Sequence, residues 1–228
     1  MYHSVHYTHW IKAVKRNIVL SGMKKKTRTI SEVQGRGRPR GFDTEKALDQ
    51  AMRVFWKHGF EGASLPLLTE AMGINRPSMY AAFGNKEELF RRAVERYVEI
   101  TGGMFQAALA QPTARGAVEM LLKGILECGC GSKIRGCMLV QSALACGEAG
   151  DAVKHELELR RAAVEKLLRS RFERAVVEGD LGKGADVGAL AKFFATFQNG
   201  LAVQMASGAK KEELMGAVGV AMGAWPRG

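Results

Sequence analysis

The sequence has no long hydrophobic run. No stretch approaches the roughly 18–20 consecutive apolar residues that a membrane-spanning helix requires. The most apolar segment near the N-terminus, residues 10–20, is interrupted by Lys12, Lys15, Arg16 and Asn17, which makes it a poor signal peptide as well. We therefore expect a cytoplasmic protein without membrane contact.

Signatures of catalysis are also missing. The chain contains no H-E-x-x-H, no P-loop, no G-x-S-x-G and no grouping of His, Cys and Asp at catalytic spacing. We expect neither enzymatic activity nor a bound metal or cofactor. Cysteine is scarce, and its four residues lie in one short region, at Cys128, Cys130, Cys137 and Cys146. In a cytoplasmic protein such residues are thiols by default rather than a disulfide framework.

What the chain does contain is an excess of positive charge near its N-terminus. Its 228 residues, 46% hydrophobic and 25% charged, have the composition of a globular protein, with a net charge of +11. Ten of the 34 Lys and Arg residues lie in residues 1–41, against Glu32 as the only acid. Residues 1–40 are therefore interpreted as a flexible basic arm suited to a polyanion such as nucleic acid. Within it, Met23 opens MKKKTR and is interpreted as the more natural translation start.

From residue 42 onward the spacing of apolar residues is helical, and nothing reads as a strand. Residues that cap helices stand at Asp43, Ser64, Asn75 and Asn85. They predict helices over about 44–58, 65–72, 76–83 and 86–110, the last with Gly102-Gly103 allowing a bend.

Five more helical patterns follow Pro112. We expect these helices over about 114–128, 137–147, 151–178, 186–207 and 211–224. The fold class predicted is all-α, with a three-helix DNA-binding head at residues 41–101 and a larger helical domain for ligand binding and dimerisation at residues 102–228.

The two short helices around Gly73 have the spacing of a helix-turn-helix. Apolar residues on the first of them can meet Ile74, Met79 and Phe83, which leaves Arg76, Ser78 and Tyr80 free to face DNA. Residues 37–94, about a quarter of the chain, closely resemble the N-terminal domain of the TetR/AcrR family of bacterial transcriptional regulators. The matching positions are Gly59-Phe60, Ser64, Ala71, Gly73, Ile74, Ser78, Tyr80, Phe83, Gly84, Lys86 and Leu89. The sequence departs from the family's habit at Leu67-Leu68-Thr69 and at Ala81-Ala82, which bears on sequence preference more than on fold.

The resemblance implies roles for residues of the head. Ser64, Tyr80 and Lys86 would contact backbone phosphates, and Arg76, Pro77 and Ser78 would begin the groove-facing helix. An arginine there can bind guanine O6 and N7, and a helix N-terminus offers N–H groups to a phosphate. The alternative for Tyr80 and Phe83 is core packing, which we favour for Phe83 and not for Tyr80.

The arm carries its own motif, RGRPRG, which resembles an AT-hook core. Arg36, Arg38 and Arg40 flank Gly and Pro, so this segment can lie extended in a narrow minor groove. The alternative is a solvated linker that adds only salt-sensitive, non-specific affinity.

Behind the head, the resemblance implies a divergent domain that binds a small effector and dimerises through its last two long helices. The residues expected to line the effector cavity are Met104, Phe105, Met120, Leu121, Met138, Leu139 and Phe172. The residues expected at the dimer interface are Phe193, Phe194, Phe197, Leu201 and Met205, with burial inside one chain as the alternative.

The function predicted is that of a DNA-binding transcriptional regulator. The resemblance favours a homodimeric repressor that binds a palindromic double-stranded operator and is released by an unidentified small molecule. One alternative is an architectural DNA-binding protein with little sequence selection. Another is a regulator that responds to oxidants or metal through the thiols between Cys128 and Cys146, since closely spaced thiols beside Lys133 and Arg135 can be reactive.

Overall fold

The computed structural model describes residues 42–131, 134–144 and 151–226, and all regular secondary structure within these ranges is helical. The predicted all-α class is therefore confirmed for the part of the chain described. None of its helices there combines the length and apolarity that crossing a membrane demands.

Three helices form the head, α2 (Thr44–Gly62), α3 (Leu65–Met72) and α4 (Arg76–Phe83). Each begins at the polar residue expected to cap it, because a side-chain oxygen there accepts a hydrogen bond from a backbone N–H of the first turn. Gly73 ends α3 with a φ of 65°, a left-handed conformation that favours glycine. This turn ends α3 and lets α4 begin three residues later, at Arg76.

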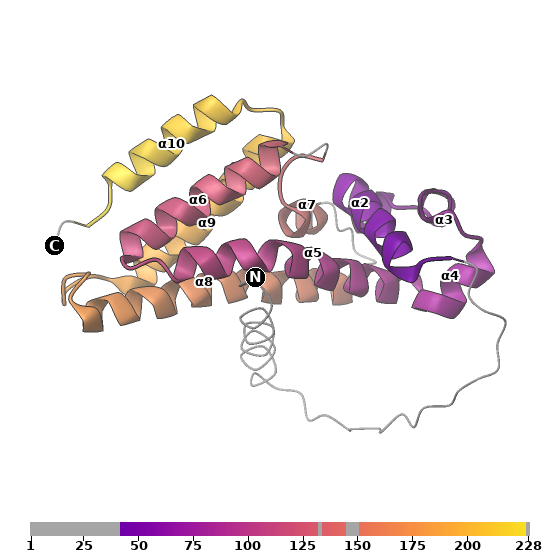
Figure 1. Cartoon of the computed structure of the whole chain (residues 1–228), viewed down its shortest axis with the longest axis horizontal. Helices are drawn as coiled ribbons and strands as arrows, with labels where there is room; N and C mark the ends of the chain where they lie inside the picture. Colours follow the sequence, from indigo (N-terminus) through magenta and orange to yellow (C-terminus); the bar gives the residue numbers. More distant parts are fainter. Residues whose placement is uncertain (1–41, 132–133, 145–150, 227–228) are drawn as a thin grey trace, which may run out of the picture.

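Six more helices follow in the described residues, and the first of them joins the head to the body. They are α5 (Lys86–Leu109), α6 (Ala114–Gly131), α7 (Met138–Leu144), α8 (Asp151–Glu178), α9 (Val187–Ala206) and α10 (Lys211–Gly223). The long helices α5 and α8 run alongside each other across the molecule, with α2, α3 and α4 gathered at one end and α6, α9 and α10 at the other (Figure 1). Helix α7 lies between these two groups and packs against α2 (Figure 1).

Most helix boundaries lie close to those expected, although α6 ends at Gly131, three residues later than expected. Helix α2 continues to Gly62 instead of stopping at Gly59, although Gly59 itself is non-helical, with φ 68° and ψ −177°. The expected glycine stop is thus a kink between two helical pieces. Helix α5 runs unbroken through Gly102-Gly103, where a bend had been allowed.

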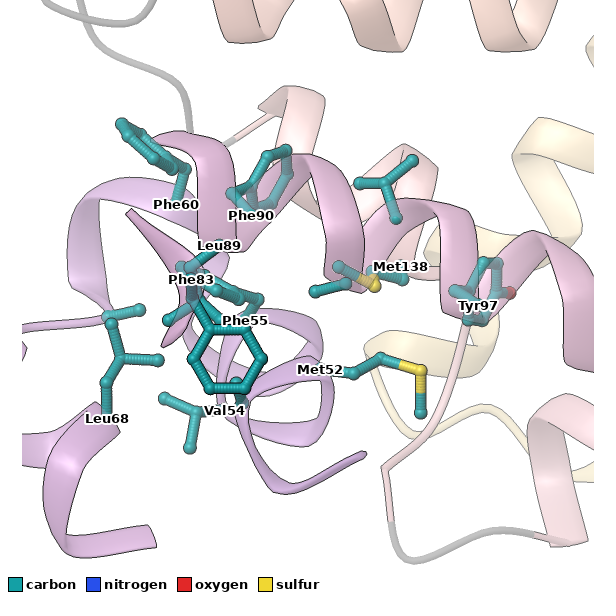
Figure 2. Close-up of a cluster of buried hydrophobic side chains, with 14 of the residues drawn as sticks. Met52, Val54, Phe55, Phe60, Leu68, Phe83, Leu89, Phe90, Tyr97 and Met138 are labelled. Carbon is teal, nitrogen blue, oxygen red and sulfur yellow. The ribbon is translucent and has the colours of Figure 1, made fainter. Parts of the chain in front are cut away.

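Two clusters of buried side chains form the core. The first lies under the head and is rich in aromatic rings, with Phe90 edge-on to Phe55 and Phe60 at centroid distances of 5.0 and 5.3 Å. Figure 2 shows Phe60 and Phe90 at one end of this cluster and Tyr97 at the other. It also takes in Met138 of α7 and residues at the start of α8, so the head is seated on body helices. The second cluster fills the space between α6, α8, α9 and α10.

Candidate nucleic-acid interface and ligand cavity

The turn between α3 and α4 is built from local hydrogen bonds. Ser64 Oγ accepts from the N–H of Leu67 at 3.3 Å, and Asn75 Oδ1 accepts from the N–H of Ser78 at 2.9 Å. Both capping side chains remain exposed. The Ser64 hydroxyl therefore keeps its own hydrogen available to donate to an outside acceptor such as a phosphate oxygen.

Helix α4 has one face in the core and one in solvent. Met79, Ala82 and Phe83 are buried, and Phe83, at 1% exposure, has the core role expected for it. Arg76, Pro77 and Tyr80 lie on the exposed side and Ser78 is half-buried. Tyr80 is 46% exposed, so core packing, the alternative for this residue, is wrong. Three of the predicted DNA-facing residues of α4 are thus accessible to DNA, and the fourth, Ser78, is only partly so.

The side chain of Lys86 does not extend into solvent toward a phosphate but contacts residues at the end of α2. Its Nζ lies 4.6 Å from the centre of the Phe60 ring and donates to the Glu61 carbonyl at 3.5 Å. Burial lowers the pKa of Lys86 below its usual value, and the charge of Glu61 opposes that shift. Lys86 therefore joins the start of α5 to the end of α2, and it must leave Phe60 to reach DNA.

Backbone N–H groups at the N-terminus of α5 also form hydrogen bonds within the chain. Asn85 Oδ1 accepts from the Glu88 N–H at 2.8 Å, and Glu88 Oε2 accepts from the Asn85 N–H at 2.9 Å. This capping box uses N–H groups that the sequence left open for a phosphate, and it adds a carboxylate at the same place. The arginines of the arm, Arg36, Arg38 and Arg40, lie outside the described residues.

A cavity of about 120 Å³ lies between α5, α6, α7, α8 and α9. Three of the residues expected to line it do so, Met104, Phe105 and Leu139. The other four expected residues do not line this cavity. Met120 is 40% exposed on the surface, and the core clusters enclose the remaining three, Leu121, Met138 and Phe172.

Sequence reasoning missed several residues of the cavity wall. Trp56 reaches it from α2 of the head, Tyr97 and Val98 from α5, and Gln198 from α9. Trp56 lies outside the apolar stripe expected for its helix, and its ring packs edge-on against Tyr97 at 5.1 Å. No periodicity within a single helix identifies such residues, because the cavity is formed where five helices and the head meet.

The residues expected at a dimer interface divide into two groups. Phe194, Leu201 and Met205 are buried within this chain, with Phe194 only 2% exposed, which favours for these three the stated alternative of burial inside one chain. Phe193 is 45% exposed, and the half-buried Phe197 stacks on it with the ring centres 6.2 Å apart. On the same helix Val203 is exposed, and on α10 so is Val220.

Two of the three thiols in the described residues border the cavity. Cys128 and Cys137 are wall residues, and Cys137 Sγ accepts a hydrogen bond from the Tyr97 hydroxyl at 3.5 Å. Cys130 Sγ accepts from Arg135 at 3.8 Å, and Cys146 lies outside the described residues. In the segments that the structure describes, no three His, Cys, Asp or Glu side chains group as metal ligands would. Thiol-based sensing stays a prediction.

We expect the stability of the protein to fall steeply in alkaline solution because of Tyr97. Burial, together with the Cys137 thiol, raises the pKa of Tyr97 well above its usual value of 10.0. Above pH 10 the unfolded chain loses this proton and the folded chain keeps it, so the free energy of unfolding decreases by about 1.4 kcal/mol per pH unit. Tyr97→Phe removes this dependence. Urea unfolding of both proteins between pH 8 and 11 measures it, and parallel curves would contradict the assignment.

Comparison with known proteins adds three findings. Residues 47–93 match the family described as bacterial regulatory proteins, tetR family. The HTH-type transcriptional repressor ComR of Escherichia coli (strain K12) is 31% identical over 196 residues, which cover 85% of this chain and 93% of ComR. A cysteine mutant of the TetR family transcriptional regulator CifR, solved with a 26-base-pair operator DNA, is 42% identical, with a TM-score of 0.80, covering 83% of this chain and all of that one.

Proposed function

The chain belongs to the TetR family of bacterial regulatory proteins and is a DNA-binding transcriptional regulator, and from that premise we propose that it is a homodimeric repressor released from its operator by a small molecule. The observation that carries this proposal is the exposed face of α4, on which Arg76, Pro77 and Tyr80 stand clear of the core. The proposed domains are an arm at residues 1–40, a head at 41–101 and a ligand-binding and dimerising body at 102–228.

The head has the groups needed to read and hold duplex DNA. Arg76 stands at the first turn of α4, the end of a recognition helix that contacts base edges, and Pro77 and Ser78 follow it. Tyr80 and Ser64 present hydroxyls from two helices, which suits phosphates on either side of the groove. Lys86 can bind a phosphate only if its ammonium leaves the Phe60 ring. The acidic residues in the first turn of α5 disfavour a phosphate at this helix end.

Two heads are needed to read a palindrome, and α9 and α10 of the body carry exposed apolar side chains. Phe193 and Val203 of α9 and Val220 of α10 are large, exposed and apolar. A second copy packing on these two helices around a two-fold axis would bury such side chains. The proposed interface uses α9 and α10 as predicted, through Phe193 and Phe197, the two expected interface residues that are not buried within the chain.

The position of the cavity supports release by a ligand. Its wall includes Trp56 of the head and Tyr97 of α5, the helix that connects head and body. A molecule that enters between them favours one placement of the head over another, and so changes the spacing of two heads in a dimer.

The proposal is tested by selecting bound duplexes from a random pool with the full chain. We expect a palindrome whose half-sites lie about one helical turn apart, and a dimer in sedimentation. Fluorescence anisotropy on the selected duplex and on a scrambled one, over a series of salt concentrations, then compares specific with non-specific binding. At physiological salt the selected duplex should bind at least about 10³-fold more tightly.

An architectural DNA-binding protein gives a different result in the same experiment. It would bind both duplexes with similar affinity and lose both steeply as salt rises. That outcome, or a monomer at the concentrations that bind DNA, would overturn the proposed function.

A further inference from the structure

The cavity that we assign to the effector is small and mainly apolar. Its volume is about 120 Å³, and Val98, Phe105 and Ile125 are among the apolar side chains of its wall. A hydrophobic cavity of roughly 150 Å³ in another protein holds benzene. A ligand here is therefore mostly apolar and about the size of one aromatic ring with at most a short substituent.

The charges at the wall favour a neutral ligand. Among the wall residues of the described segments Arg160 alone carries a charge, and its guanidinium is held by Glu156, with Nε and Nη2 at 2.9 and 2.8 Å from one carboxylate oxygen. The raised pKa of Tyr97 keeps its phenol neutral. An anion or cation in the cavity would lose its hydration without meeting a free counter-charge.

Two wall residues have a buried polar atom without a partner in the described structure. They are the indole Nε1 of Trp56, a donor, and Oε1 of Gln198, an acceptor. A buried donor that lacks an acceptor disfavours the state that contains it, and a ligand that supplies the acceptor recovers that free energy. Trp56 belongs to the head and Gln198 to α9 of the body.

We propose that the effector is a small, neutral, mostly apolar molecule with one polar group, and that this group accepts a hydrogen bond from Trp56. The inference rests on the proposed function, in that it assigns a ligand class to the cavity through which release would act. A carbonyl or a hydroxyl oxygen can each accept from the indole N–H. In either case the ligand is held by a head residue, so its binding is coupled to the placement of α2.

Three probes and one conservative variant test this ligand class by calorimetric titration of the full chain. Acetophenone has the acceptor, cumene matches it in size without a polar group, and benzoate carries a charge. Trp56→Phe keeps an aromatic ring and removes the N–H. We expect Trp56→Phe to raise the Kd of acetophenone about fivefold and that of cumene less than twofold, with no binding of benzoate to either protein.

A second variant locates the binding. Ala163 lines the cavity from α8, and Ala163→Leu should abolish binding of both neutral probes by filling the space. The inference is overturned if Trp56→Phe weakens acetophenone and cumene equally, if benzoate binds as tightly as acetophenone, or if Ala163→Leu leaves binding unchanged. Circular dichroism of both variants shows whether each is folded, so that a folding defect is not mistaken for a loss of binding.

The DNA experiment separates this inference from the function on which it rests. A protein that prefers a palindromic duplex but binds benzoate overturns the ligand class and leaves the regulator intact. A protein that binds acetophenone through Trp56 but shows no DNA preference overturns the proposed function and leaves the ligand class.

Discussion

Replacing Arg76 with alanine is expected to lower the affinity for the selected operator by at least about thirtyfold. Arg76 is exposed at the first turn of α4, where an arginine can bind guanine O6 and N7. One such contact contributes about 1–3 kcal/mol of discrimination, and a homodimer makes it twice, which gives about 2–6 kcal/mol in all. Anisotropy titrations on selected and scrambled duplexes measure the loss, which should fall almost entirely on the selected one.

Arg169→Ala is the matched control for this substitution. Arg169 is exposed on α8 of the body, where its Nε bonds Glu173 at 3.0 Å. The control removes the same charge away from the proposed interface, so operator affinity should change by less than about twofold. If Arg76→Ala instead weakened binding to both duplexes by one common factor, Arg76 would be a phosphate ligand and another residue would read the bases.

Much of the head could be predicted because its helix boundaries depend on local hydrogen bonds. Asp43, Ser64, Asn75 and Asn85 were expected to cap helices, and each accepts a hydrogen bond from the first turn of its helix. The left-handed turn at Gly73 is local too. The exposed face of α4 then follows from the helical period, since the buried Met79 and Phe83 are four residues apart.

The body was predicted less completely, because its surfaces depend on which distant helices meet. Phe193 and Phe194 are neighbours in an apolar stretch, and one is exposed and the other buried. The sequence shows that both residues belong to an apolar region of the helix. Which of the two side chains is buried depends on where α6, α8 and α10 pack against α9. The cavity differs from expectation for the same reason, since Trp56 enters it from a helix that the sequence assigns to the head.

Gly136→Ala is expected to reduce the free energy of unfolding by about 2–5 kcal/mol. Gly136 has a φ of 89°, a conformation that costs an L-residue about 1–2 kcal/mol. An added Cβ would lie 2.8 Å from the carbonyl oxygen of Ala202 and 2.6 Å from Nε2 of Gln141. The Gln141 amide is itself held by the Arg135 carbonyl at 2.6 Å, so it cannot move away freely. Overpacking of this kind costs a further 1–3 kcal/mol or so. Urea unfolding at a fixed protein concentration measures the change.

Gly103→Ala makes the same chemical change but is expected to raise the free energy of unfolding. Gly103 is exposed within α5, and an added Cβ there would meet nothing within 4 Å. Alanine favours a helix over glycine, so this variant should be more stable by about 0.5–1 kcal/mol. Gly136 also borders the cavity and abuts α9, which means that strain at this position acts on the wall where a ligand binds. If Gly136→Ala were as stable as Gly103→Ala, the close approach of α9 to this loop would be wrong, and with it the shape of the cavity from which the ligand class was inferred.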